Sequence, residues 1–221
     1  MSNKRKLIKV SVIFILSIFG FSLQSQLICQ TDKSNQIKIG SEIWMSENLN
    51  VDKFKNGDPV PQAKTNEEWL NAGENQKPVW CYYENKEANG AKFGKLYNWF
   101  AINDKRGLAP EGWLIPKITD WEKLIQESEV ETFPGKVLKS KEYWIEDGNG
   151  TNENGFNAFP GGQRETSGNF SGFGEFGFWW VCEEDNSVAA WLFTMNYGSP
   201  SVSQSTSDKG VGFSVRCIKK D

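Results

Sequence analysis

The most informative absence in the sequence is histidine, which occurs nowhere among its 221 residues. Without an imidazole, the chain cannot form a Ser-His or Cys-His nucleophile pair or supply a histidine general base. It also cannot provide the histidine that many zinc sites contain. Any catalysis would have to use carboxylates, Cys, Lys, Tyr or a bound cofactor, so we expect a protein that is not an enzyme.

An excess of positive charge is also missing, because 25 Lys and Arg stand against 28 Asp and Glu. Four of the basic residues lie within the first nine positions, ahead of an apolar run at 10–23. This order is typical of a secretory signal peptide, and the run is too short to span a bilayer. We therefore predict a signal peptide over residues 1–29, with an uncleaved N-terminal anchor as the alternative.

Export would leave an acidic protein. Removing residues 1–29 leaves 21 basic against 28 acidic side chains, and no Lys/Arg cluster remains. A negative surface repels phosphate backbones, so we expect no nucleic-acid partner. The expected location is outside the cell or in its envelope.

The four cysteines agree with export but leave their chemistry open. Cys29 follows the apolar run, where a bacterial lipoprotein carries its lipid, and is a lipidation candidate for an outer-membrane anchor. The bulky Ile28 before it favours ordinary signal cleavage instead. Cys81, Cys182 and Cys217 are disulfide candidates in an oxidising compartment, and buried free thiols are the alternative.

The mature chain is predicted to be one domain. Residues 30–36 form a short polar leader, and residues 37–221 contain no second linker or repeat. Capping boxes predict short helices that begin at Thr65 and Thr119. The apolar segment 96–102 is predicted to be helical in preference to a strand.

The C-terminal half is predicted to form antiparallel strands. Apolar residues alternate along 176–182, 191–197 and 211–217. The segment 147–164, rich in Asn, Gly and Pro, is too long for a simple connector and is either a functional loop or an ordered surface excursion. The expected fold class is α+β, with short helices and a mainly antiparallel, loop-rich sheet.

Several segments, taken in order, resemble a known family. They are Ile43–Asn50, Phe54–Asp58, Trp80–Tyr83, Gly94–Trp99, Arg106–Trp113, Asn149–Asn152, Phe159–Gly162, Phe178–Trp180 and Gly212–Cys217. Together they resemble the Fibrobacter succinogenes major paralogous domain, a family of exported bacterial proteins. The resemblance implies a place at the cell envelope or outside it and names no ligand.

A more distant resemblance concerns the fold. Trp113–Glu122 is similar to a helix start in relatives of the formylglycine-generating enzyme, and Gly212–Arg216 is similar to their closing strand. This resemblance implies a C-type lectin-like fold, although the chain departs from the pattern at Lys117, Ile118 and Asp120. Those enzymes bind copper with two cysteines close in sequence, and no two cysteines here are close.

Two polar clusters are candidate ligand-binding sites. They comprise Glu183, Glu184 and Asp185 in a predicted turn, and Asn152, Glu153 and Asn154 in the long segment. Oxygen-rich loops can bind Ca²⁺, but neither cluster has the spacing of an EF-hand. We therefore expect no cofactor, and Ca²⁺ is the alternative. For the residues themselves, the alternative to a ligand-binding role is that they are solvated turn residues.

Trp179 is the candidate aromatic platform. On a strand it points away from its neighbour Trp180, so one of the two faces away from the core. An exposed Trp179 beside carboxylates and amides could stack on a sugar ring. The alternative is that residues 147–164 cover it.

The sequence therefore predicts an exported, non-enzymatic module of the cell envelope that binds a glycan or a surface protein. Contact with the membrane would come only through a lipid anchor. An oxidase of the formylglycine-generating type and a purely structural envelope module are the alternatives.

Overall fold

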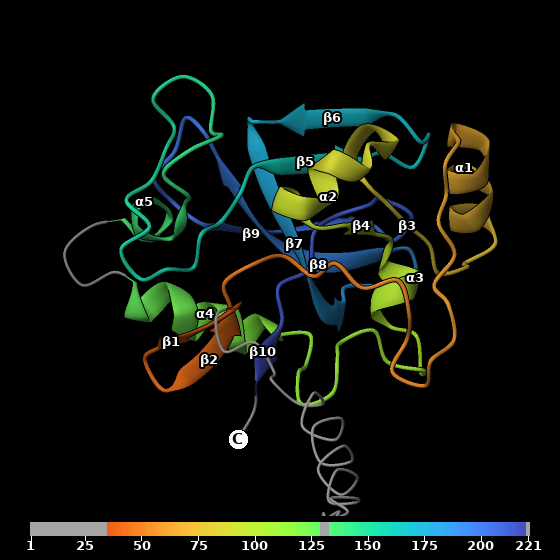
Figure 1. Cartoon of the computed structure of the whole chain (residues 1–221), viewed down its shortest axis with the longest axis horizontal. Helices are drawn as coiled ribbons and strands as arrows, with labels where there is room; N and C mark the ends of the chain where they lie inside the picture. The colour runs from red at the N-terminus through yellow and green to blue at the C-terminus, as the bar shows by residue number, and fades with distance from the viewer. Residues whose placement is uncertain (1–34, 129–132, 220–221) are drawn as a thin grey trace, which may run out of the picture. The chain divides into compact units, whose positions relative to one another are not determined.

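The computed structural model describes residues 35–128 and 133–219. The predicted signal peptide and Cys29 lie outside these residues. The described chain has a mixed α+β architecture, in which short helices alternate with small, mainly antiparallel sheets (Figure 1). The predicted fold class is therefore confirmed at the level of α+β.

The elements are given in chain order. They are β1 (Gln36–Ile39), β2 (Glu42–Met45), α1 (Asn66–Glu74), β3 (Trp80–Cys81), the 3₁₀ helix η2 (Tyr83–Asn85), α2 (Glu87–Phe93), β4 (Leu96–Tyr97), α3 (Trp99–Ile102), α4 (Ile118–Glu127), α5 (Pro134–Leu138), β5 (Gly161–Arg164), β6 (Phe170–Phe173), β7 (Phe176–Glu184), β8 (Ala189–Asn196), β9 (Ser203–Asp208) and β10 (Ile218–Lys219). The sheets have the orders β1-β2-β10, β3-β4, β5-β6 and β7-β8-β9.

The predicted hairpin of aromatic strands is confirmed as β7 and β8, which pair antiparallel with Phe178 opposite Thr194. The prediction of 211–217 as the third strand is wrong. The polar strand β9 pairs with β8 instead, and residues 211–217 make only single bridges, for example from Phe213 to Tyr97. The apolar alternation in 211–217 arises because this segment is buried between elements, whereas β9 is exposed and needs no apolar face.

Two of the three predicted helices are present, one of them with a corrected start. The Thr65 capping box of α1 is confirmed, since Thr65 Oγ1 accepts from the Glu68 N–H and Glu68 accepts from the Thr65 N–H. Helix α4 begins earlier than predicted, because Asp120 accepts the Lys117 N–H at 2.8 Å and closes the turn. Segment 96–102 divides into β4 and α3, so the prediction of one helix there is wrong.

Both faces of β7 are buried. Trp180 packs with Tyr97 and Phe213 on one face, and Trp179 packs with Trp121 and Phe156 on the other. Phe156 belongs to the long segment 147–164. This segment is therefore ordered, and it covers one face of the β7-β8-β9 sheet. This outcome confirms the alternative in which Trp179 is covered.

Buried cations hold the loops together. The buried basic side chains are Lys95, Lys139, Arg164, Lys209 and Arg216. Each donates to backbone carbonyl oxygens and lies over an aromatic ring. A guanidinium or ammonium group with several donors satisfies carbonyls that no helix or sheet would pair.

Candidate functional site

A cavity of about 490 Å³ lies beside the C-terminal end of α3. We call it the α3 pocket. Its lining residues are Gln76, Pro78, Trp99, Phe100, Asn103, Asp104, Lys105 and Arg106. Its volume lies within the range of small-molecule sites, which is about 300–1,000 Å³.

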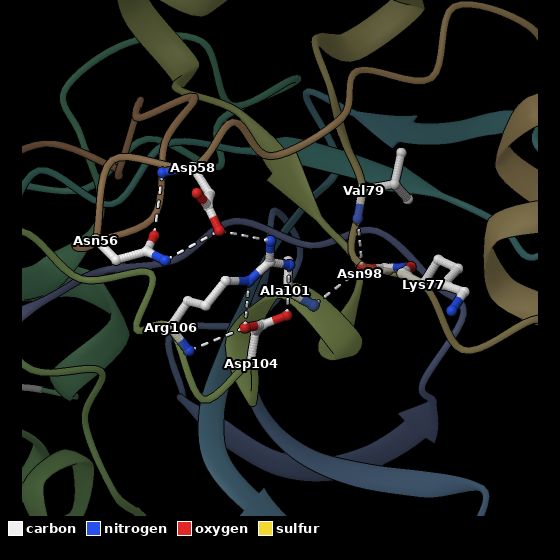
Figure 2. Close-up of polar contacts among 8 residues, drawn as sticks. All are labelled: Asn56, Asp58, Lys77, Val79, Asn98, Ala101, Asp104 and Arg106. Atoms are coloured by element: carbon white, nitrogen blue, oxygen red, sulfur yellow. Dashed lines mark hydrogen bonds and ion pairs between the residues drawn. The ribbon is translucent and has the colours of Figure 1, made fainter.

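Asn98 joins the two walls of the α3 pocket (Figure 2). Its Oδ1 accepts from the Ala101 N–H at 3.2 Å, which caps α3, and from the Val79 N–H at 3.1 Å. Its Nδ2 donates to the Lys77 carbonyl oxygen at 2.8 Å. Asn98 is fully buried, so these bonds are shielded from water and fix the wall at 76–79 against α3. The pocket is therefore formed before any ligand arrives.

Arg106 organises the rim of the pocket. Its Nε and Nη2 donate to the two carboxylate oxygens of Asp104 at 2.9 and 2.8 Å, and its Nη1 lies 3.4 Å from Asp58 Oδ2 (Figure 2). Asn56 donates to the same Asp58 oxygen at 2.9 Å. The guanidinium carbon lies 4.0 Å from the centroid of the Phe54 ring. This bidentate, stacked geometry leaves Arg106 little freedom to move.

The electrostatics of the rim favour charged carboxylates. The hydrogen bonds from Arg106 are the main cause that holds the pKa of Asp104 below its usual value. The pKa of Asp58 is lowered by its bond from Asn56 first and by Arg106 second. The pKa of Arg106 is raised in turn, chiefly by Asp104. A general acid at neutral pH needs a raised pKa, so these carboxylates are suited to binding.

Asp104→Asn should lower the melting temperature at pH 7 by about 2–4 °C, because it removes up to about 1 kcal/mol of a partly exposed contact. The folded-state pKa of Asp104 lies below its usual value, so the contact stabilises the fold above that value and is lost as the pH falls through the folded pKa. The difference between the two melting temperatures should therefore begin to shrink as the pH falls below about 4 and should vanish only below the folded-state pKa of Asp104. A melting difference that stays constant down to low pH would contradict this assignment.

The proposed platform residue is not available to a ligand. Trp179 is fully buried, and its Nε1 donates to Asn48 Oδ1 at 2.9 Å. The prediction of an exposed Trp179 is therefore wrong, because Trp121 and Phe156 cover the second face of β7.

The acidic turn has structural contacts. Glu183 accepts the Ile118 N–H at 2.6 Å and so binds the N-terminus of α4. Glu184 pairs with Lys209 at 2.8 Å, and the Asp185 carboxylate accepts from the side chain of its neighbour Asn186. A ligand role for these residues stays a prediction.

The polar cluster in 147–164 shapes its own loop. Asn152 Oδ1 accepts the Asn157 N–H at 2.7 Å, and Asn154 bonds to Ser128 Oγ and to the Phe156 N–H. Glu153 is exposed. A ligand role for this cluster also stays a prediction.

Cys81, Cys182 and Cys217 are free thiols, so the prediction of a disulfide between two of them is wrong. Cys81 and Cys217 lie in different core clusters, which keeps their sulfur atoms apart. Burial raises the pKa of both thiols to about 12 and also raises that of Cys182. Protonated, buried thiols are poor nucleophiles and poor metal ligands. Among residues 35–128 and 133–219, no cluster of three or more Cys, Asp or Glu is arranged to hold a metal ion.

The α3 pocket is the site that sequence reasoning missed. Its fixed groups come from segments that carry the family resemblance: Asp58 from Phe54–Asp58, Asn98 from Gly94–Trp99 and Arg106 from Arg106–Trp113. The one sequence feature that could have pointed to this pocket is that polar residues occur in three of these segments. The fold brings them together, and their spacing along the sequence does not show that they meet.

Comparisons with known proteins place the chain in a family. A family model described as the Fibrobacter succinogenes major domain matches residues 37–219. No curated protein and no solved structure matches. In the part of the chain that the structure describes, no helix has the length and apolar character to cross a membrane. The family model spans nearly all of the predicted mature domain, and the chain therefore belongs to the Fibrobacter succinogenes major domain family.

Proposed function

We propose that the protein is an exported, non-enzymatic module of the cell envelope that binds a glycan in the α3 pocket. The observation that carries this function is a pre-formed cavity of about 490 Å³ with aromatic and polar walls. The proposal includes the signal peptide over residues 1–29, with or without a lipid on Cys29. It also includes a C-type lectin-like fold, with which the mixed α+β architecture agrees.

The lining of the pocket suits a ligand rich in hydroxyl groups. Phe100 supplies an apolar wall on which the apolar face of a sugar ring can stack. The amides of Gln76 and Asn103 can both donate and accept hydrogen bonds. Asp104 and Arg106 neutralise each other, which leaves Lys105 as the remaining charged residue of the lining.

Two chemical features support binding without catalysis. The pKa of Asp58 and that of Asp104 are both lowered, which removes them as general acids at neutral pH. The buried thiols of Cys81 and Cys217 stay protonated. An oxidase that uses a pair of reactive cysteines would need the opposite arrangement.

Phe100→Ala should weaken glycan binding at least about tenfold, because it removes the apolar wall of the pocket. A glycan array identifies the ligand of the native protein, and calorimetry then compares the variant with it. Phe133→Ala is the matched control, since Phe133 is 63 % exposed and lies outside the pocket.

The control should bind as the native protein does. Unchanged affinity of Phe100→Ala, or an array without any bound glycan, would refute a glycan site at this pocket. Capture of a surface protein in place of a glycan, lost in Phe100→Ala, would reassign the pocket to protein recognition.

A further inference from the structure

A run of aromatic rings crosses the surface formed by η2, α2, β6 and the segment at 143. The rings are, in spatial order, Phe170, Tyr83, Phe173, Phe93 and Tyr143, and we call them the aromatic ladder. Successive ring centroids lie 5.1, 4.7, 4.7 and 5.3 Å apart. None of these residues lines the α3 pocket.

Two rings of the ladder are exposed to solvent and two more are partly exposed. Tyr143 is 47 % exposed and Phe173 is 36 % exposed, whereas Tyr83 and Phe170 are half-buried. Phe93 is buried and supports the exposed rings from below. Ile145, also exposed, extends the apolar surface. Contiguous apolar surface of this kind marks an interaction site more often than scattered single residues do.

Close backbone approach holds the ladder in place. Gly162 of β5 has φ +64°, and a Cβ there would lie 2.9 Å from the Tyr83 ring and 2.6 Å from the Ser171 carbonyl oxygen. Only glycine lets Tyr83 and β6 pack this tightly. Helix α2 lies next to β6 (Figure 1), where Phe93 contacts Phe173. The rings are therefore positioned by packed elements on both sides.

Backbone strain lies at the outer part of the ladder. Tyr143 has φ +77°, which is uncommon for a bulky side chain. Glu84 and Asn85, directly after Tyr83, have φ +53° and +55°. Such conformations persist where the surrounding structure imposes them, and they cluster at ligand-binding sites.

Two ion pairs flank the ladder. Lys92 binds Glu142 at 3.0 Å and lies 5.2 Å from the centroid of the Tyr143 ring. Lys86 binds Glu84 at 2.7 Å. Both pairs cancel locally, and the mature chain is acidic, so a polyanion would be repelled. The surface is complementary to a neutral partner that combines apolar faces with hydroxyl groups.

We propose that the aromatic ladder is a binding platform for an extended, neutral polysaccharide. Each exposed ring stacks on the apolar face of a sugar unit, and the flanking ion pairs receive hydroxyl groups. This platform shares its class of ligand with the α3 pocket but none of its residues, so the two sites succeed or fail separately. An extended chain is favoured over a single sugar because two exposed rings, Phe173 and Tyr143, lie on either side of the buried Phe93.

Affinity gel electrophoresis tests the platform, with mixed-linkage β-glucan or galactomannan in the gel and polygalacturonate as the charged comparison. The native protein should be retarded by at least one neutral polysaccharide and not by polygalacturonate. Tyr143→Asn and Phe173→Ala should each weaken retardation at least about tenfold. Asn tolerates a positive φ, so Tyr143→Asn removes the ring without adding backbone strain.

One control variant accompanies the test. Phe133→Ala, an exposed phenylalanine outside the ladder, should be retarded as strongly as the native protein. Circular dichroism confirms that every variant is folded. The ladder proposal is overturned if neither neutral polysaccharide retards the native protein, or if Tyr143→Asn and Phe173→Ala are retarded normally. It is also overturned if sedimentation shows that these residues instead join two copies of the chain.

Discussion

Arg216→Leu is expected to lower the free energy of unfolding by about 3–5 kcal/mol. Arg216 is fully buried, and its Nε and Nη2 donate to Asn48 Oδ1 at 3.2 and 2.8 Å. Its Nη1 donates to the carbonyl oxygens of Met45 and Phe156. Leucine fills much of the space but removes the Nη1 donor from the Met45 and Phe156 carbonyl oxygens, and a buried acceptor without a donor costs about 1–3 kcal/mol. Asn48 Oδ1 loses two of its three donors and keeps the Trp179 Nε1–H.

The charge of Arg216 is retained at neutral pH. Burial lowers its pKa to about 9, and the nearby carboxylate of Glu47 opposes this shift. The guanidinium also lies 4.5 Å from the centroid of the Phe156 ring. Arg216, in the segment Gly212–Cys217, thus binds both the segment Ile43–Asn50, which contains Asn48, and the long segment 147–164. Loss of this single side chain should loosen all three.

Urea denaturation of Arg216→Leu and Arg106→Leu compares a fully buried arginine with a partly exposed one. Arg106→Leu should cost about 1 kcal/mol or less, because its partners can be solvated. If Arg216→Leu does not fold, Arg216→Lys supplies the comparison, since lysine keeps the charge but cannot form the planar fork. Equal losses at the two positions would show that Arg216 does not hold these segments together.

Local signals in the sequence predicted local structure correctly. The Thr65 capping box and the alternation of 176–182 with 191–197 each depend on neighbouring residues, and both are present in the fold. The alternation in 211–217 gave a wrong prediction because apolar periodicity indicates burial and does not by itself indicate strand pairing. This segment is buried but makes only isolated β-bridges. At α4 the capping carboxylate is Asp120, so the helix begins earlier than the Thr119 pattern indicated.

The candidate site was harder to predict because exposure is set by distant residues. Trp179 had the correct strand phase, yet Phe156 and Trp121 cover it from other parts of the chain. Tyr143 and Phe173 are exposed, but nothing in their local sequence distinguishes them from buried aromatics. The only sequence feature related to them is the Phe159–Gly162 segment, because Gly162 permits the close packing beneath the aromatic ladder.

Gly162→Ala should lower the free energy of unfolding by about 3 kcal/mol. A Cβ at φ +64° strains the backbone, which costs about 1–2 kcal/mol by itself. The same Cβ would lie 2.6 Å from the Ser171 carbonyl oxygen and 2.8 Å from the Phe173 nitrogen. Both atoms belong to the backbone of β6, so the strand must shift, and overpacking of this kind costs about 1–3 kcal/mol.

Two glycine controls separate these causes in the same urea experiment. Gly57 has φ +91° with no atom within 4 Å of an added Cβ, so Gly57→Ala should cost only the backbone strain. Gly161, the neighbour of Gly162, has its nearest contact at 3.4 Å, so Gly161→Ala should cost little. A Gly162→Ala loss no larger than that of Gly57→Ala would mean that β6 accepts the methyl group. In that case the glycine would not be what holds Tyr83 against Phe173, and the rigidity of the ladder would have to come from Phe93 and α2 alone.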